Sequence, residues 1–150
     1  MIGHYRKRII VTAALAMATG AHPLLSQARA AQMAAKPGTG AVAESPEIRR
    51  GRLLFIQCRA CHDLKAGIPH KVGPNLNGML GRKAGMASGF ALYSPALKAW
   101  AAVWDAALLD KWIERPSAVV PGNSMAFAGL ASAKDRAALV NYVVTESSKK

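Results

Sequence analysis

Apolar residues recur at helical spacing in four segments of this 150-residue chain. The first segment opens with Ser45-Pro46-Glu47, in which a serine cap is followed by a proline in the first turn and by an acidic side chain near the helix N-terminus. Ile48, Gly51 and Phe55 then fall on one face of the predicted helix. A glycine inside a helix costs about 1 kcal/mol relative to alanine, so Gly51 predicts the close approach of another helix.

Three further helices are predicted downstream, over residues 94–101, over residues 105–115 and after residues 132–135. Asp105 caps the second of these helices and Pro116 ends it. Residues 132–135 read S-A-K-D, which resembles a capping box before the last helix. The residues that form the apolar faces of these two helices are Leu108, Leu109, Trp112 and Ile113, and then Leu139, Tyr142 and Val143.

Residues 67–89 interrupt this helical pattern with many glycines and with Pro69 and Pro74. This composition predicts a long loop with short turns. A loop of this length in a small domain is usually functional or is wrapped around something. No run of residues alternates as a half-buried strand would, and no internal repeat is evident. The sequence therefore predicts an all-α fold.

The first thirty residues have the layout of a secretory signal peptide. Basic residues at positions 6–8 precede an apolar segment at residues 9–21, and residues 28–30 read A-R-A, a cleavage sequence. We expect cleavage after Ala30 and export to the periplasm. An uncleaved anchor is the alternative, although the apolar segment is shorter than the ~20 residues that span a bilayer comfortably.

The rest of the chain divides into a flexible leader at residues 31–44, rich in Ala, Gly and Pro, and one domain at residues 45–150. The whole chain has 20 Lys and Arg against 8 Asp and Glu, and without the four basic residues of the signal peptide the net charge falls from +12 to about +8. The basic residues are scattered, which argues against a nucleic-acid partner. We expect a monomer that binds acidic surfaces of partner proteins, with peripheral association with an anionic membrane as a further target.

Residues 58–62 read C-R-A-C-H, and this pentapeptide carries the most specific chemistry in the chain. Two thiols at this spacing can each add to a vinyl group of one haem, and the histidine that follows then becomes an axial ligand of the iron. A redox dithiol would need a βαβ context. A zinc site would need more ligands, and the chain has no other cysteine and only His4, His22 and His70 besides. A plain disulfide stays open, but the sequence favours haem c attached through Cys58 and Cys61.

An electron carrier needs a second axial ligand, so that the iron stays six-coordinate, and a thioether favours the reduced metal. Outside the signal peptide the candidates are Met33, Met79, Met86 and Met125. Met33 lies in the leader, and Met79 and Met86 lie in the glycine-rich loop, where packing or surface roles are expected. Met125 follows the turn residues 121–124, which could present its side chain inward. The residues alone leave the choice open.

Residues 47–145 resemble a class I cytochrome c of the mitochondrial and bacterial soluble type. The matching stretches are 51–55, 58–62, 70–76, 81–85, 89–90, 93–98, 103–105, 120–127 and 136–142. Their order and spacing hold throughout, which a chance C-x-x-C-H would not give. The resemblance implies about four to five helices wrapped around one covalently bound haem, with the N- and C-terminal helices crossing where Gly51 and Phe55 meet Leu139 and Tyr142.

The same resemblance implies roles for individual residues. His62 and Met125 would be the axial ligands, and the carbonyl of Pro74 would accept a hydrogen bond from the imidazole of His62. A buried haem propionate needs donors or a cation, and the residues placed near it are Arg82, Tyr93 and Trp104, with Asn123 where many relatives have a threonine. Without the resemblance, Tyr93 and Trp104 would be interpreted as ordinary core aromatics.

The chain departs from the family pattern around the methionine ligand. Trp112 stands where many relatives have a tyrosine, and Leu97 stands where many have a buried asparagine. An indole can donate a hydrogen bond but cannot accept one, so we expect a drier, differently connected polar network beneath the methionine. Lysines that flank the methionine loop in many relatives are Ser117, Ala118 and Ser124 here, whereas Lys71, Lys83 and Lys98 remain basic.

These features predict an exported mono-haem electron carrier rather than an enzyme, working between redox proteins in a respiratory or other periplasmic chain. A haem peroxidase would need an open iron position and a distal acid or base, and neither His70 nor any carboxylate lies in the methionine segment. A cytochrome subunit dedicated to one periplasmic dehydrogenase or oxidase is the other alternative, which the leader or an uncleaved N-terminus would suit.

Overall fold

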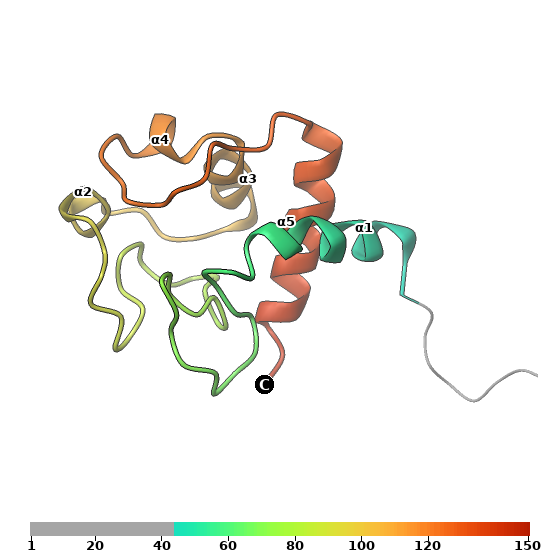
Figure 1. Cartoon of the computed structure of the whole chain (residues 1–150), viewed down its shortest axis with the longest axis horizontal. Helices are drawn as coiled ribbons and strands as arrows, with labels where there is room; N and C mark the ends of the chain where they lie inside the picture. The colour runs from blue at the N-terminus through green and yellow to red at the C-terminus, as the bar shows by residue number, and fades with distance from the viewer. Residues whose placement is uncertain (1–43) are drawn as a thin grey trace, which may run out of the picture. The chain divides into compact units, whose positions relative to one another are not determined.

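The computed structural model describes residues 44–150, and this part of the chain contains five α-helices and one short 3₁₀ helix (Figure 1). The elements are α1 (Pro46–Leu54), η1 (Phe55–Gln57), α2 (Pro95–Ala99), α3 (Ala106–Glu114), α4 (Pro116–Val119) and α5 (Ala133–Ser147). Within residues 44–150 the single β-pairing is an isolated bridge between Lys83 and Val103. The all-α prediction is therefore confirmed for the described residues, while the predicted signal peptide and nearly all of the leader lie outside them.

The predicted helix starts at Ser45, Asp105 and Ser132 are confirmed. In each case the side-chain oxygen accepts a hydrogen bond from the backbone N–H three residues further on, at 3.2, 2.7 and 3.3 Å respectively. These bonds satisfy N–H groups of the first turn that have no partner within the helix.

Pro116 begins a helix as well as ending one. α3 stops at Glu114, Arg115 is extended, and Pro116 is the first residue of the short helix α4. Proline suits a first helical position, because its backbone has no N–H that would need a partner there. Taking the residue only as a stop signal predicts four helices and misses α4.

The first and last helices cross, as Figure 1 shows for α1 and α5. Gly51 is buried at the crossing, and a methyl group built on it would overlap the backbone of Ala138 and the side chain of Tyr142. The rings of Phe55 and Tyr142 lie 5.6 Å apart at the same contact. The close approach predicted from Gly51 is confirmed, and it explains a glycine in the middle of a helix.

α3 packs against α5, and the long segment between η1 and α2 extends from this helical unit (Figure 1). Residues 67–89 form turns and loop, as predicted, apart from the bridge at Lys83. The buried side chains that join the helices include Phe55, Leu109, Trp112, Ile113, Leu139 and Val143. Within residues 44–150, none of the helices has both the length and the apolar character needed to cross a bilayer.

Candidate haem-binding site

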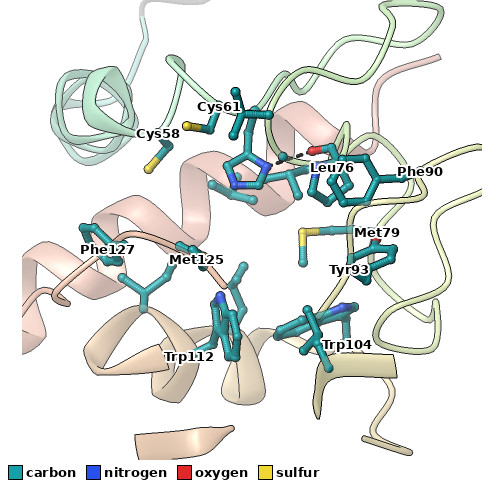
Figure 2. Close-up of a pocket in the computed structure, with 18 of the residues that line it drawn as sticks. Cys58, Cys61, Leu76, Met79, Phe90, Tyr93, Trp104, Trp112, Met125 and Phe127 are labelled. Atoms are coloured by element: carbon teal, nitrogen blue, oxygen red, sulfur yellow. Dashed lines mark hydrogen bonds between the residues drawn. The ribbon is translucent and has the colours of Figure 1, made fainter. Parts of the chain in front are cut away.

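The C-R-A-C-H segment forms the turn that directly follows η1. The backbone N–H groups of Cys61 and His62 both donate to the carbonyl of Cys58, at 3.1 and 2.9 Å. Both thiols are free, and all three side chains line one cavity (Figure 2). Burial, with a smaller effect of Cys61, raises the pKa of Cys58 to about 11. A redox-active dithiol has a lowered thiol pKa, so these surroundings are not those of a redox pair.

His62 is held in one orientation by its neighbours. Its Nδ1 lies 2.8 Å from the carbonyl oxygen of Pro74. A carbonyl can only accept, so Nδ1 carries the proton and Nε2 keeps its lone pair for a metal. Gly73 packs so closely on the imidazole that a methyl group there would overlap the ring. Burial is the main cause of a lowered His62 pKa, which favours the neutral, metal-binding form.

Lys71 fastens the turn around His62. Its Nζ donates to the carbonyl oxygens of Arg59 and His62, at 3.0 and 3.1 Å, and lies 3.2 Å from a carboxylate oxygen of Asp63. The sequence analysis noted Lys71 as one of three positions that remain basic. The structure shows that its ammonium group is already engaged with the attachment turn.

A second set of hydrogen bonds orders the loop behind Pro74. Asn75 donates through Nδ2 to the carbonyls of Lys65 and Ile68, at 2.9 and 2.7 Å, and its backbone N–H donates to Nδ1 of His70 at 2.9 Å. Asn77 in turn donates through its backbone N–H to Asn75 Oδ1 at 2.7 Å. The sequence interpretation gave these residues no role. The sequence signal that could have indicated this role is the presence of two asparagines in a glycine-rich loop, because asparagine side chains often form hydrogen bonds with nearby backbone groups.

Met125 lines the same cavity and lies in the segment between α4 and α5. Asn123 donates to the carbonyl of Val120 through both its backbone N–H and Nδ2, at 3.1 and 2.8 Å, and its Oδ1 accepts from the N–H of Met125 at 3.0 Å. Gly122 has a φ of 80°, a left-handed conformation that suits glycine. Asn123 is not among the cavity-lining residues, so the structure places it as a brace for the Met125 turn.

The other methionines differ in exposure. Met79 is 3% exposed and lines the cavity, and Figure 2 shows it with Met125 among the lining side chains. Met86 is 53% exposed and does not line the cavity. The packing role expected for Met79 and the surface role expected for Met86 fit these positions, and Met33 lies outside the described residues.

Arg82, Tyr93 and Trp104 also line the cavity. The backbones of Arg82 and Trp104 are paired, with the N–H of Trp104 donating to the carbonyl of Arg82 at 3.0 Å. The N–H of Ala87 donates to the Tyr93 hydroxyl at 3.2 Å, and burial is the main cause of a raised Tyr93 pKa. Among residues 44–150, the guanidinium of Arg82 bonds the backbone carbonyls of Asn75 and Asn77, at 3.4 and 3.3 Å.

The wall near Met125 is almost entirely apolar. Trp104 and Trp112 line it with Leu97, and their indole rings meet edge to face at 5.5 Å. Trp100 stacks on Trp112 at 6.1 Å and meets Trp104 edge to face at 5.6 Å. Trp112 and Leu97 thus contribute packed hydrocarbon to the lining, and the drier polar network expected beneath the methionine stays a prediction.

The cavity fits the chemistry of haem c. A flat apolar macrocycle matches the aromatic and aliphatic lining, and the two thiols and His62 match its attachment and ligation. The carboxylate of a propionate matches Arg82, a partly buried cation that has no ion pair among the described residues. Within residues 44–150, no group of three or more His, Cys, Asp or Glu side chains is placed so that it could hold a metal ion.

Comparisons with known proteins agree with this chemistry. No protein-family model matches the chain. It is 42% identical over 97 residues to cytochrome c of Kluyveromyces lactis, a match that covers 64% of this chain and 87% of the relative. It is also 42% identical over 97 residues to cytochrome c2 of Rhodomicrobium vannielii, covering 65% of this chain and 77% of the relative.

A solved structure matches as well. Cytochrome cH from Methylobacterium extorquens superposes with a TM-score of 0.60 and 37% identity, over 65% of this chain and 97% of that chain. Together, the paired thiols, the oriented histidine, the apolar cavity and these similarities identify the chain as a member of the class I c-type cytochromes, electron carriers rather than enzymes, with haem c attached through Cys58 and Cys61.

Proposed function

We propose that this cytochrome is exported to the periplasm and shuttles single electrons between larger redox proteins of a respiratory or other periplasmic chain, with His62 and Met125 as the axial ligands. The bound haem supplies an iron that cycles between ferric and ferrous states. The protein's contribution is to hold both ligands, so that little rearranges when an electron enters or leaves.

The observation that carries this proposal is the convergence of His62 and Met125 on one cavity from separate, independently braced segments. The hydrogen bond from Nδ1 of His62 to Pro74 leaves Nε2 as the ligating atom. The hydrogen bonds of Asn123 with Val120 and Met125 hold the turn that carries Met125. Two protein ligands would close the coordination sphere of the iron, which would favour electron transfer through the iron over chemistry at it.

The other residues in and around the cavity have supporting roles in this proposal. Arg82, Tyr93 and Trp104 would bind a haem propionate, with Arg82 supplying the charge and Tyr93 and Trp104 supplying neutral donors. Asn123 would act indirectly by positioning Met125, because its side chain bonds the turn. This assignment modifies the direct cofactor contact that the resemblance implies for Asn123.

Absorption spectra of the two redox states test the ligand pair, with Met125→Ala and Met79→Leu as matched variants. The oxidised wild-type protein should show the weak thioether–ferric charge-transfer band at neutral pH. Met79→Leu should keep this band and Met125→Ala should lose it and bind carbon monoxide readily when reduced. A wild-type protein without the band, or loss of the band in Met79→Leu alone, would reject Met125 as the ligand.

Export and partner choice need separate measurements. Intact mass of the protein from a secreting host should give a chain beginning at Ala31 plus one haem, and a retained N-terminus would contradict cleavage after Ala30. The positive net charge favours partners with acidic surfaces, since opposite charge accelerates encounter. Stable co-purification with a single dehydrogenase or oxidase would instead favour a dedicated subunit.

A further inference from the structure

All three tryptophans of the chain, Trp100, Trp104 and Trp112, lie in one cluster. The ring centroids of every pair lie 5.5 to 6.1 Å apart. The three indoles come from different segments, because Trp100 directly follows α2, Trp104 lies between α2 and α3, and Trp112 lies on α3. Aromatic rings often pack in this way, so what distinguishes this cluster is where each ring lies relative to the cavity and the solvent.

The cluster connects the haem cavity with the outer surface. Trp104 and Trp112 both line the cavity (Figure 2), and Trp112 is only 6% exposed. Trp100 packs against the same core but does not line the cavity, and it is partly exposed. Its exposed atoms therefore lie outside the cavity. The three rings form a continuous aromatic route from the cavity to solvent, called here the indole path.

The chemistry of indole gives this route a direction. Indoles lose an electron more readily than most side chains, and electron transfer is fast between rings that lie this close. The positive charge left on an indole is costly in apolar surroundings such as those of Trp112, which belongs to the hydrophobic core. At Trp100, water can stabilise the charge and accept the proton of the indole N–H. An oxidising equivalent that enters the indole path at the cavity is therefore most stable at Trp100.

We propose that Trp100 is an oxidative modification site, at which oxidising equivalents that hydrogen peroxide delivers to the bound haem leave the cavity through the indole path. This inference requires haem in the cavity, and it depends neither on the redox partners nor on which residue is the second axial ligand. The path protects the haem and the thioether of Met125, which also lines the cavity and is open to oxidation to the sulfoxide.

The proposed reaction balances with hydrogen peroxide as the oxidant. The peroxide takes up two electrons and two protons and becomes two water molecules. Trp100 supplies both electrons through Trp104 or Trp112, releases two protons to solvent and takes one oxygen atom from water. The net change converts one peroxide and one indole into one water and one hydroxyindole at position 100.

Peroxide treatment of the ferric holoprotein tests the proposal, with Trp100→Phe and Trp100→Tyr as matched variants. The two new side chains have nearly the same volume, but only the phenol of tyrosine gives up an electron readily. Loss of haem absorption should be several-fold faster in Trp100→Phe than in wild type, and Trp100→Tyr should restore much of the protection. Peptide mass spectrometry should find one added oxygen on Trp100 in wild type and more Met125 sulfoxide in Trp100→Phe.

Met86 is the internal control, because it is 53% exposed and does not line the cavity, so peroxide in solution oxidises its thioether directly. Met86 oxidation should be equal in the three proteins. Equal rates of haem loss in Trp100→Phe and Trp100→Tyr would overturn the proposal, because only packing would then matter at this position. Oxygen found on Tyr93, the tyrosine that lines the cavity, with Trp100 unmodified in wild type would also overturn it.

Discussion

The two sides of the haem cavity, one carrying His62 and the other carrying Met125, are held in place by different interactions. On the His62 side, hydrogen bonds from Lys71, Asn75 and the imidazole itself fasten the turn and the loop behind it. On the Met125 side, indole rings and aliphatic side chains pack together, and Asn123 supplies the polar brace. His62 is therefore positioned by hydrogen bonds, and Met125 is positioned chiefly by the packing of apolar side chains.

This difference suggests how each ligand fails. Directional bonds fix the tautomer and orientation of His62, so a perturbation there changes ligation before it changes the rest of the fold. Packing on the Met125 side has no preferred hydrogen-bond geometry, so its integrity depends on filled volume. Substitutions that remove volume should matter most on the Met125 side, and substitutions that move one atom should matter most on the His62 side.

Trp112→Ala should give the largest loss of stability. The side chain is 6% exposed and contacts two other indoles, so its removal should cost about 3–5 kcal/mol of unfolding free energy. Trp112→Phe keeps an aromatic ring and loses the N–H, and it should cost much less. Urea unfolding of both holoproteins measures the difference. Similar losses in the two variants would mean that the part of the indole that phenylalanine lacks, rather than the presence of an aromatic ring, holds the Met125 side.

Gly73→Ala should disturb the His62 side with a single added methyl group. That methyl overlaps the imidazole, so the ring must move or the loop must shift, at a cost of about 1–3 kcal/mol. Gly67→Ala is the control, because nothing lies near its added methyl although its φ of 73° still makes alanine strained. Only Gly73→Ala should alter the absorption spectrum of the haem. Unchanged spectra in both variants would show that Gly73 does not position His62.

Asn123→Ala should weaken the brace of the Met125 turn. It removes the bonds to the carbonyl of Val120 and from the N–H of Met125, at about 1 kcal/mol each. The oxidised variant should lose the methionine charge-transfer band at lower pH than wild type. Ser117→Ala, a change at an exposed residue of α4 that does not line the cavity, should leave the band unaffected. An intact band in Asn123→Ala would mean that packing alone positions Met125.

Sequence reasoning succeeded where one residue type has a single physical explanation. Helix starts at Ser45, Asp105 and Ser132 follow from local capping chemistry, and Gly51 indicates a helix crossing because few other causes favour a glycine there. The pentapeptide at residues 58–62 likewise identifies its cofactor. In each case the interactions that decide the outcome are local or chemically distinctive.

The remainder depends on contacts that the sequence does not encode locally. Lys71 looks like an ordinary surface lysine, and only the folded turn brings two carbonyls and Asp63 to its ammonium group. The role of Asn123 as a brace needs the backbone geometry of the turn. Proline can end one helix or begin the next, so the presence of Pro116 in the sequence does not by itself predict α4.

Tyr93→Phe should have the smallest effect on the free energy of unfolding. It tests whether the Tyr93 hydroxyl contributes to stability at alkaline pH. Burial raises the pKa of Tyr93, so the folded protein holds this proton more tightly than the unfolded chain does. Stability attributable to the proton is complete below the ordinary tyrosine value of ~10 and is lost as pH rises through the folded pKa. Tyr93→Phe should therefore lose less stability than wild type between neutral pH and about pH 11 in urea unfolding. The neutral-pH measurement isolates the lost hydrogen bond from Ala87, and parallel pH curves for the two proteins would contradict the prediction.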